Sequence, residues 1–324
     1  METIDILLAT YNGEKYLREQ IDSILQQTYK NIRLIISDDC SSDNTMSILR
    51  EYEKRDERVI VYSQHNNLGV IKNFEFLLSK VENELYMLSD QDDIWLSDKV
   101  EKTYDELKKN NADLVYTDLE IVDADLNTID NSFNRYMKLD DKIKNTLKNT
   151  NMSQYLYNTV TGCTIMSKKK FIKDMLPIPT ESKFILHDTW IALYVSLNGK
   201  IFYLNKPTIK YRQHEINQVG IRKKEKNCNT FEEYRNTFIN SKIELFDVYI
   251  KNGNIFPEEF KKLNKESYDY FKYIKDKKYI AMRKIKTFHK LYNYENFKNY
   301  IGNLIILNVP IIAKIVYKMK EVSK

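Results

Sequence analysis

The chain has 324 residues, of which 42% are hydrophobic and 30% are charged. This composition excludes wholesale disorder, and the length fits one large domain with an additional region. Neither G-x-G-x-x-G nor G-x-x-x-x-G-K-[ST] occurs, so we expect no Rossmann dinucleotide site and no P-loop of the usual kind. The three cysteines lack C-x-x-C spacing; they fit a reducing compartment and predict neither a disulfide framework nor a zinc site.

The net charge of +5 hides a difference between the two ends of the chain. From residue 251 onward there are 17 lysines and arginines against 7 acids, whereas the first 250 residues hold 34 against 39. An acidic front and a basic tail suggest different partners for each. The N-terminus has acids where a signal peptide needs basic residues, and no run of 18 apolar residues exists, so we expect no transmembrane helix.

The first 117 residues alternate short apolar runs with helical periodicity. Apolar runs predict strands at 4–8, 32–36, 59–62, 85–88 and 112–116. Apolar residues at helical spacing predict helices around 17–25, 46–52, 74–81 and 100–107. This alternation predicts an α/β fold with a mainly parallel sheet that helices cover on both faces.

The rest of the chain is less regular. Strands are expected at 161–166 and 200–204, and a helix at 188–197. From residue 225 the pattern is helical and rich in Lys and Tyr. We therefore divide the chain into a catalytic domain of residues 1–222 and a helical C-terminal region of residues 223–324.

Polar residues follow each of the first four predicted strands, where parallel sheets bind their ligands. The most informative loop is Asp90-Gln91-Asp92-Asp93. Three carboxylates so close repel one another unless a cation lies among them, and all-oxygen ligands suit Mg²⁺ or Mn²⁺ with substrate phosphates. The other interpretation is an acidic helix N-terminus, because a predicted helix begins soon after this loop.

The order of these loops carries a resemblance. Residues 9–12, then 38–43, then 90–95 resemble the successive signatures of family 2 glycosyltransferases of the GT-A fold. Residues 162–163, 187–190 and 211–214 extend the match less firmly. The D-Q-D-D variant is similar to rhamnosyltransferase-like members that use a deoxythymidine diphosphate sugar.

The resemblance implies a site for a nucleotide sugar. Asp39 would accept a hydrogen bond from the pyrimidine N3–H, Lys72 would contact the base or a phosphate, and Asp90 would meet the ribose. The full set implied for the nucleotide sugar is Thr10, Tyr11, Asn12, Glu14, Asp39, Gly69, Lys72, Asp90 and Gln91.

The resemblance also implies a metal and a sugar site. Asp92 would ligate the Mn²⁺ or Mg²⁺ that bridges the diphosphate, with Asp90 and His214 as further ligands. Arg212 and His214 would hold the diphosphate. The donor and acceptor sugars would lie against Gly162 and Cys163. Trp190 would either pack in the core, which is the default for a tryptophan, or stack on the acceptor sugar.

Asp188 is the candidate general base that the resemblance supplies. The incoming hydroxyl has a high pKa and needs such a base, and an aspartate at a helix N-terminus stays ionised. Attack opposite the diphosphate would invert the anomeric centre. The alternative is that Asp188 is only the N-cap of the predicted helix.

The apolar segment 301–317 is too short and too interrupted to span a bilayer, and lysines flank it. It could lie on the inner leaflet of the plasma membrane, or pack on its own domain or on a second subunit of a homo-oligomer. We expect a cytoplasmic protein, peripheral at the membrane if the segment binds lipid.

The resulting prediction is an inverting, metal-dependent, non-processive glycosyltransferase, because the Q-x-x-R-W motif of processive members is absent. The donor would be a UDP- or dTDP-sugar and the acceptor a cell-envelope or lipid-linked glycan, with no nucleic acid partner. The alternatives are a sugar-1-phosphate nucleotidyltransferase, whose glycine-rich loop and arginine are missing at residues 10–14, and a catalytically silent glycan-binding or assembly protein.

Overall fold

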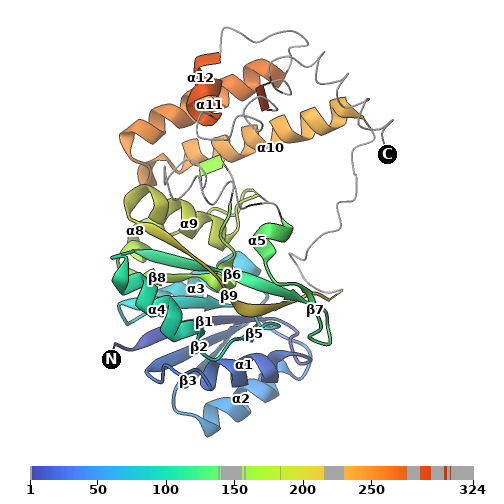
Figure 1. Ribbon diagram of the computed structural model, residues 1–324, viewed down its shortest axis with the longest axis vertical. Coiled ribbons are helices and arrows are strands. Elements are labelled where there is room, and N and C mark those ends of the chain that lie inside the picture. The colour runs from blue at the N-terminus through green and yellow to red at the C-terminus, as the bar shows by residue number, and fades with distance from the viewer. Residues whose placement is uncertain are drawn as a thin grey trace. The chain divides into compact units, whose positions relative to one another are not determined.

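The computed structural model describes residues 2–137, 139, 155–156, 158–182, 184–214, 230–275, 285–292, 303–304 and 307. The chain divides into two compact units. The first comprises Met1–Ile178 and Leu186–Gly220, and the second comprises Pro179–Ile185 and Ile221–Lys324. Figure 1 shows the strands within the first unit and the long helices α10 and α11 within the second.

The first four strands are parallel neighbours, as the alternating sequence predicts. They are β1 (Ile4–Thr10), β2 (Ile32–Asp38), β3 (Val59–Ser63) and β4 (Leu85–Ser89), arranged in the order β3-β2-β1-β4. Because they run in the same direction, the loops that follow them meet at one edge of the sheet.

The sheet continues beyond β4 with mixed directions. β8 (Met166–Lys168) lies antiparallel between β4 and β6 (Leu114–Val122). β6 pairs in parallel with β9 (Ile201–Arg212), and the outer strand β5 (Ile94–Trp95) is antiparallel to β9. The short β7 (Thr128–Asp130) pairs with β6. The expected α/β fold with a mainly parallel sheet is confirmed.

Helices cover both faces of this sheet. α1 (Leu17–Leu25), α2 (Thr45–Arg55) and α4 (Lys99–Lys109) bury their apolar residues with Ile4, Ile6 and Leu8 of β1. Side chains alternate along a strand, so Leu7 faces the other side. There, α3 (Val70–Ser79) packs on β1 and β2, and α9 (His187–Asn198) packs on α3.

Two expected strands differ from the structure. Within 161–166, residues Gly162–Thr164 form the 3₁₀ turn η1, and the strand β8 begins only at Met166. The strand expected at 200–204 continues to Arg212, and its register with β6 shifts between Leu204 and Pro207. A proline cannot donate to a ladder but is tolerated at such an irregularity.

Short helices complete the first unit between its strands. They are α5 (Phe133–Tyr136), η2 (Lys169–Phe171) and α8 (Ile172–Met175). The N-cap of α5 is Ser132, whose side-chain oxygen accepts a hydrogen bond from the Arg135 amide.

The second unit is helical. α10 (Phe231–Lys251) begins with a capping box in which Thr230 and Glu233 exchange side-chain-to-backbone hydrogen bonds. After the turn η3 (Gly253–Ile255), α11 (Glu258–Lys275) packs on α10, and α12 (Ile285–Tyr292) packs on α11. Apart from residues 303, 304 and 307, the segment 301–317 lies outside the described residues. Among the helices that the structure describes, none is both long and apolar enough to cross a membrane.

Candidate active site

The loops after β1 and β2 are fastened to each other by buried hydrogen bonds. Asp38, which is fully buried, accepts a bond from the Thr10 hydroxyl at 2.9 Å and another from the Ser41 amide at 2.9 Å. The Asp39 amide donates to the Thr10 carbonyl at 2.8 Å. Asp38 is therefore the structural member of the Asp38-Asp39 pair.

Two residues predicted for the nucleotide pocket also fasten these loops. The Asn12 side-chain oxygen accepts a bond from the Ser42 amide at 2.9 Å. One Glu14 oxygen accepts bonds from both the backbone amide and the side-chain amide of Asn44, at 2.9 and 2.8 Å. Both side chains thus hold the loop after β1 against the residues just before α2.

Asp39, the other member of the pair, is 3% exposed, and its carboxylate has capacity for one more hydrogen bond to each oxygen. Its two oxygens accept the amides of Leu68 and Gly69 at 2.7 and 2.9 Å, and each oxygen keeps a second lone pair. Gly69 has a φ of 80°, a conformation that favours glycine. The apolar side chains of Tyr11 and Leu68, 42% and 37% exposed, belong to the two loops that contact Asp39. This arrangement can accept the ring N–H of a base beside apolar surfaces.

Gln91 and Lys72 have partners within the protein. The Gln91 amide exchanges two hydrogen bonds with the backbone of Tyr11, at 2.8 and 3.0 Å, and so joins the loop after β4 to the loop after β1. The Lys72 ammonium lies 3.0 Å from Glu75, which also accepts the Ile178 amide. Lys72 is partly exposed, and its predicted contact with the donor stays a prediction.

Three carboxylates from distant parts of the chain gather at this edge. Asp90 is half-buried, and its pKa is raised to about 7 by burial and by the charges of Asp92 and Asp188. Asp90 and Asp92 follow β4, whereas Asp188 lies in α9. Uncompensated carboxylates at this spacing favour a cation or a proton among them.

Asp92 and His214 form a pair that fits a metal. The His214 Nε2 lies 2.8 Å from the Asp92 Oδ2, and the His214 ring packs on Tyr16 with centroids 4.8 Å apart. Two adjacent ligand atoms that each lie about 2.1 Å from an octahedrally coordinated ion are about 3 Å from each other. The observed separation of Asp92 Oδ2 and His214 Nε2 is close to this value, so one ion could bind both atoms. A carboxylate with an imidazole suits Mn²⁺ somewhat better than Mg²⁺.

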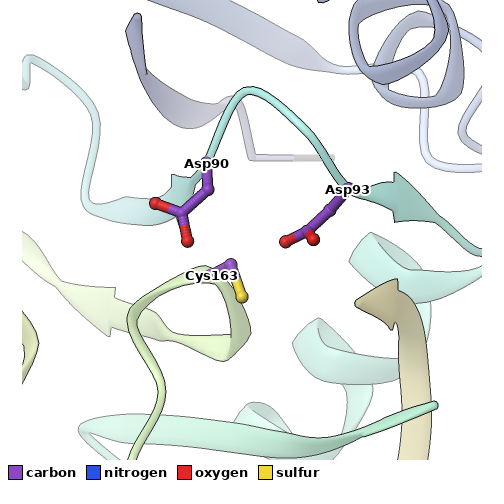
Figure 2. A group of neighbouring side chains, drawn as sticks. All are labelled: Asp90, Asp93 and Cys163. Carbon is purple, nitrogen blue, oxygen red and sulfur yellow. The ribbon is translucent and has the colours of Figure 1, made fainter. Parts of the chain in front are cut away.

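Figure 2 shows a second cluster, in which the carboxylates of Asp90 and Asp93 and the thiol of Cys163 point toward one another. Their ligand atoms all lie within 4.8 Å of one another. Cys163 is 1% exposed, and burial raises the pKa of its thiol, so the thiol keeps its proton. Sulfur is a poor ligand for Mg²⁺ and Mn²⁺, which suit carboxylate oxygen far better, so this cluster fits these ions less well than Asp92 with His214.

Asp93 is the carboxylate of the 90–93 loop for which the sequence predicted no contact of its own. It is fully buried, and its Oδ1 accepts the Arg212 amide at 3.2 Å, which fixes the acidic loop to the end of β9. Burial, followed by the charges of Asp92 and Asp90, raises the pKa of Asp93 well above its usual range. Its position in the D-Q-D-D run was the only sequence signal.

Asp188 is the second residue of α9, and Leu186 is the N-cap. The interpretation of Asp188 as a plain N-cap is therefore wrong. One Asp188 oxygen accepts the Thr189 amide at 2.5 Å, and the other accepts the Gly162 amide at 3.2 Å. These two hydrogen bonds fix the orientation of the Asp188 carboxylate at the start of α9.

Gly162 lies tightly against the start of α9. A Cβ on Gly162 would be 2.9 Å from the His187 Nε2 and 3.4 Å from the Asp188 Cβ. His187 is buried and stacks on Phe74 with ring centroids 3.8 Å apart, and burial lowers its pKa. The glycine thus permits a close contact that sets the position of Asp188.

Trp190 does not lie at the sugar site that was predicted for it. Its side chain is fully buried, and its indole N–H donates to the Met175 carbonyl at 2.8 Å. The predicted stacking on an acceptor sugar is wrong because neither ring face reaches solvent.

Arg212 does not present its guanidinium to a ligand either. The side chain is 3% exposed, and each of its three nitrogens bonds to a protein acceptor: the carbonyls of Asp92 and Ala124 and the carboxylate of Glu19. The predicted diphosphate contact of Arg212 is therefore corrected, since this guanidinium is buried and committed to the protein.

Comparisons with known proteins agree on one family. The sequence profile described as glycosyl transferase family 2 matches residues 5–175. The dTDP-rhamnosyl transferase RfbG of Shigella flexneri is 33% identical over 224 residues, which cover 66% of this chain and 73% of that relative.

Two solved structures share the fold at low identity. Staphylococcus aureus TarS 1–349, in complex with UDP-GlcNAc, aligns at a TM-score of 0.57 and 15% identity over 96% of this chain and 83% of that one. The mannosyltransferase PcManGT of Pyrobaculum calidifontis, in complex with GDP-Man and Mn²⁺, aligns at 0.53 and 15% identity over 83% and 70%.

Proposed function

Since this chain is a glycosyltransferase that belongs to glycosyl transferase family 2 and has the GT-A fold, we propose the following reaction. The enzyme moves one sugar from a pyrimidine nucleoside diphosphate to a hydroxyl of a cell-envelope or lipid-linked glycan. The transfer inverts the anomeric centre, requires Mn²⁺ or Mg²⁺ and is non-processive.

The observation that carries the proposal is the convergence of Asp90, Asp92 and Asp188 from two distant parts of the chain. The charges of Asp92 and Asp188 both raise the pKa of Asp90, so the two acids of the loop after β4 lie near the acid of α9. In this reaction a cation site and a general base must lie on either side of the reacting carbon. Asp90 and Asp92 would supply the first, and Asp188 would supply the second.

The donor's base would bind at Asp39. Uracil and thymine both carry an N3–H that the buried carboxylate can accept, while Tyr11 and Leu68 offer apolar surface. Both UDP- and dTDP-sugars fit this chemistry. The relative named as a dTDP-rhamnosyl transferase favours the dTDP-sugar.

Asp92, His214 and Asp90 would hold the divalent cation. When bound, such a cation stabilises the negative charge that grows on the departing diphosphate. Asp92 and His214 already lie side by side at 2.8 Å, and Tyr16 packs against the His214 ring.

Asp188 would take the proton of the acceptor hydroxyl. Gly162 and Thr189 hold its two oxygens through their amides, which orients the carboxylate before the acceptor arrives. Attack from the face opposite the diphosphate then inverts the anomeric centre.

The acceptor and the place of the reaction are proposed from the charge pattern. A lipid-linked acceptor fits the basic tail, with 17 lysines and arginines from residue 251 onward. We propose that the enzyme works in the cytoplasm, at the inner face of the membrane.

The test is release of nucleoside diphosphate from a panel of UDP- and dTDP-sugars with Mn²⁺ and with a chelator. One donor should be consumed only with metal. Asp92→Ala should abolish metal-dependent donor binding, and Asp188→Asn should keep donor binding but stop transfer. Asp105→Ala, which removes an exposed carboxylate of α4, should behave as wild type.

Other results would point to other functions. Consumption that requires pyrophosphate would support a nucleotidyltransferase, and the absence of any donor binding would support a catalytically silent protein. Normal turnover by Asp188→Asn would overturn the assignment of the general base.

A further inference from the structure

We propose that Arg212 is a positioning residue, a buried brace that holds the metal ligands Asp92 and His214 in place and does not itself contact the donor. The proposal rests on the metal site of the proposed function. It assigns Arg212 a task that the sequence did not suggest.

The guanidinium of Arg212 joins three separate segments. Its Nε donates to the Asp92 carbonyl at 2.9 Å, its Nη1 donates to the Ala124 carbonyl at 2.7 Å, and its Nη2 forms an ion pair with Glu19 of α1. Its backbone amide bonds to Asp93 at 3.2 Å. The acidic loop is thus tied through Arg212 to α1, to the loop before β7 and to the end of β9.

Tyr16 connects this brace to His214. The Arg212 Cζ lies 4.4 Å from the centre of the Tyr16 ring, and the same ring packs on His214 at 4.8 Å. Tyr16 is 8% exposed, so these contacts are sheltered from water, where a cation over an aromatic face is worth more. Displacing the guanidinium would therefore disturb Tyr16 and then the histidine.

The chemistry requires arginine in particular. The planar fork reaches three acceptors in different directions, whereas a lysine ammonium is a point charge on a flexible stem. Glu19 is largely exposed and balances the charge of the buried guanidinium. Removing Arg212 would leave the Asp92 and Ala124 carbonyls without this donor, and the acidic loop would lose its attachment to α1.

The experiment measures Mn²⁺ binding in the absence of donor, from the electron paramagnetic resonance signal of free Mn²⁺. Arg212→Met should weaken Mn²⁺ binding at least about tenfold, and Arg212→Lys should restore only part of it. Glu19→Gln, which loosens a single contact, should give a smaller loss and serves as the test if Arg212→Met does not fold.

The matched control is Arg18→Met. Arg18 also bridges α1 to another helix, through an ion pair with Glu51 of α2 at 2.7 Å, but its side chain is 48% exposed. Its Mn²⁺ affinity should equal that of wild type. Circular dichroism melts of all variants separate loss of the metal site from loss of the fold.

Asp92→Ala separates failure of this inference from failure of the proposed function. If Asp92→Ala binds Mn²⁺ as wild type does, the proposed metal site is wrong, and the proposed role of Arg212 is overturned as well. If Asp92→Ala loses Mn²⁺ while Glu19→Gln and folded Arg212→Met keep it, only the brace is overturned. If Arg212→Met instead lost affinity for nucleoside diphosphate in the presence of a chelator, while its Mn²⁺ affinity stayed unchanged, Arg212 would contact the phosphates and the proposal would be overturned.

Discussion

At the scale of single residues, polar side chains at the carboxyl edge of the sheet divide into those that shape the pocket and those left to bind. The sequence indicates that Asn12, Glu14 and Gln91 lie at this edge. It could not indicate that their side chains bond to Ser42, Asn44 and Tyr11. Those partners lie in neighbouring loops that are distant in sequence, and the type of a residue does not indicate which distant residue it will bond to.

Asp39→Asn tests the proposed base contact. The amide replaces one acceptor oxygen with a donor facing the amides of Leu68 or Gly69, so the loop and the contact to the base N–H are both weakened. Affinity for UDP or dTDP should fall about tenfold by calorimetry. The exposed neighbour Cys40, changed to Ser, is the control. Wild-type affinity in Asp39→Asn would contradict the assignment.

Lys99 gives the pH prediction. It is fully buried at the start of α4, over the Trp95 ring at 4.7 Å, and burial lowers its pKa from 10.5 to about 8. At a pH between these two pKa values, Lys99 carries a proton in the unfolded chain and has lost it in the folded protein. The free energy of unfolding of wild type, relative to that of Lys99→Met, should therefore rise with pH, by about 3 kcal/mol at most.

The measurement compares melting temperatures of wild type and Lys99→Met from about pH 8 to about pH 10. The difference, wild type minus variant, should increase with pH. Lys102→Met removes a partly exposed lysine of the same helix and should show no such trend. A flat difference for Lys99→Met would mean that the buried amine does not titrate in this range.

At the scale of elements, the regular βα alternation of the first half was predictable because buried parallel strands leave continuous apolar runs. β1 to β4 and the helices α1 to α4 lie close to the predicted ranges. The turn at Gly162 and the length of β9 were not predictable. The first depends on packing against α9, and the second involves shifts in the register of β9 with β6 on either side of Pro207, which only strand pairing reveals.

Gly162→Ala tests how closely η1 must approach α9. The added Cβ would collide with the His187 Nε2 at 2.9 Å, and relief of that collision moves Asp188. We expect kcat to fall at least tenfold with little change in the donor KM, and a stability loss of about 1–3 kcal/mol. Steady-state kinetics and thermal melts measure both.

Gly253→Ala is the matched control because a Cβ there would meet nothing within 4 Å. It should leave kcat unchanged. If Gly162→Ala turned over as fast as wild type, the contact between η1 and α9 would have no part in placing Asp188.

At the scale of the whole molecule, charge separates the acidic N-terminal 250 residues from the basic remainder. The sequence predicts this asymmetry directly, because composition needs no fold. It does not predict that Pro179–Ile185 belongs with the helical unit, where Ser182 bonds to Glu244 at 2.8 Å. Such a crossing of the chain leaves no local pattern.

The basic tail leads to a membrane prediction. The full chain should sediment with anionic vesicles and not with zwitterionic ones. Binding should weaken as the salt concentration rises from about 0.1 M to about 1 M, because the Debye length falls from about 10 Å to about 3 Å. Lys318→Glu with Lys320→Glu should reduce binding, whereas Lys108→Glu with Lys109→Glu should not. Equal binding to both vesicle types would contradict an electrostatic attachment.

The proposed reaction depends most on where a divalent cation binds. Anomalous X-ray diffraction at the manganese edge, from crystals soaked in Mn²⁺ and UDP, locates that ion directly. We predict a single strong peak within coordination distance of Asp92 and His214, on the side facing Asp188. A peak among Asp90, Asp93 and Cys163, or none near the acidic loop, would contradict the proposed site.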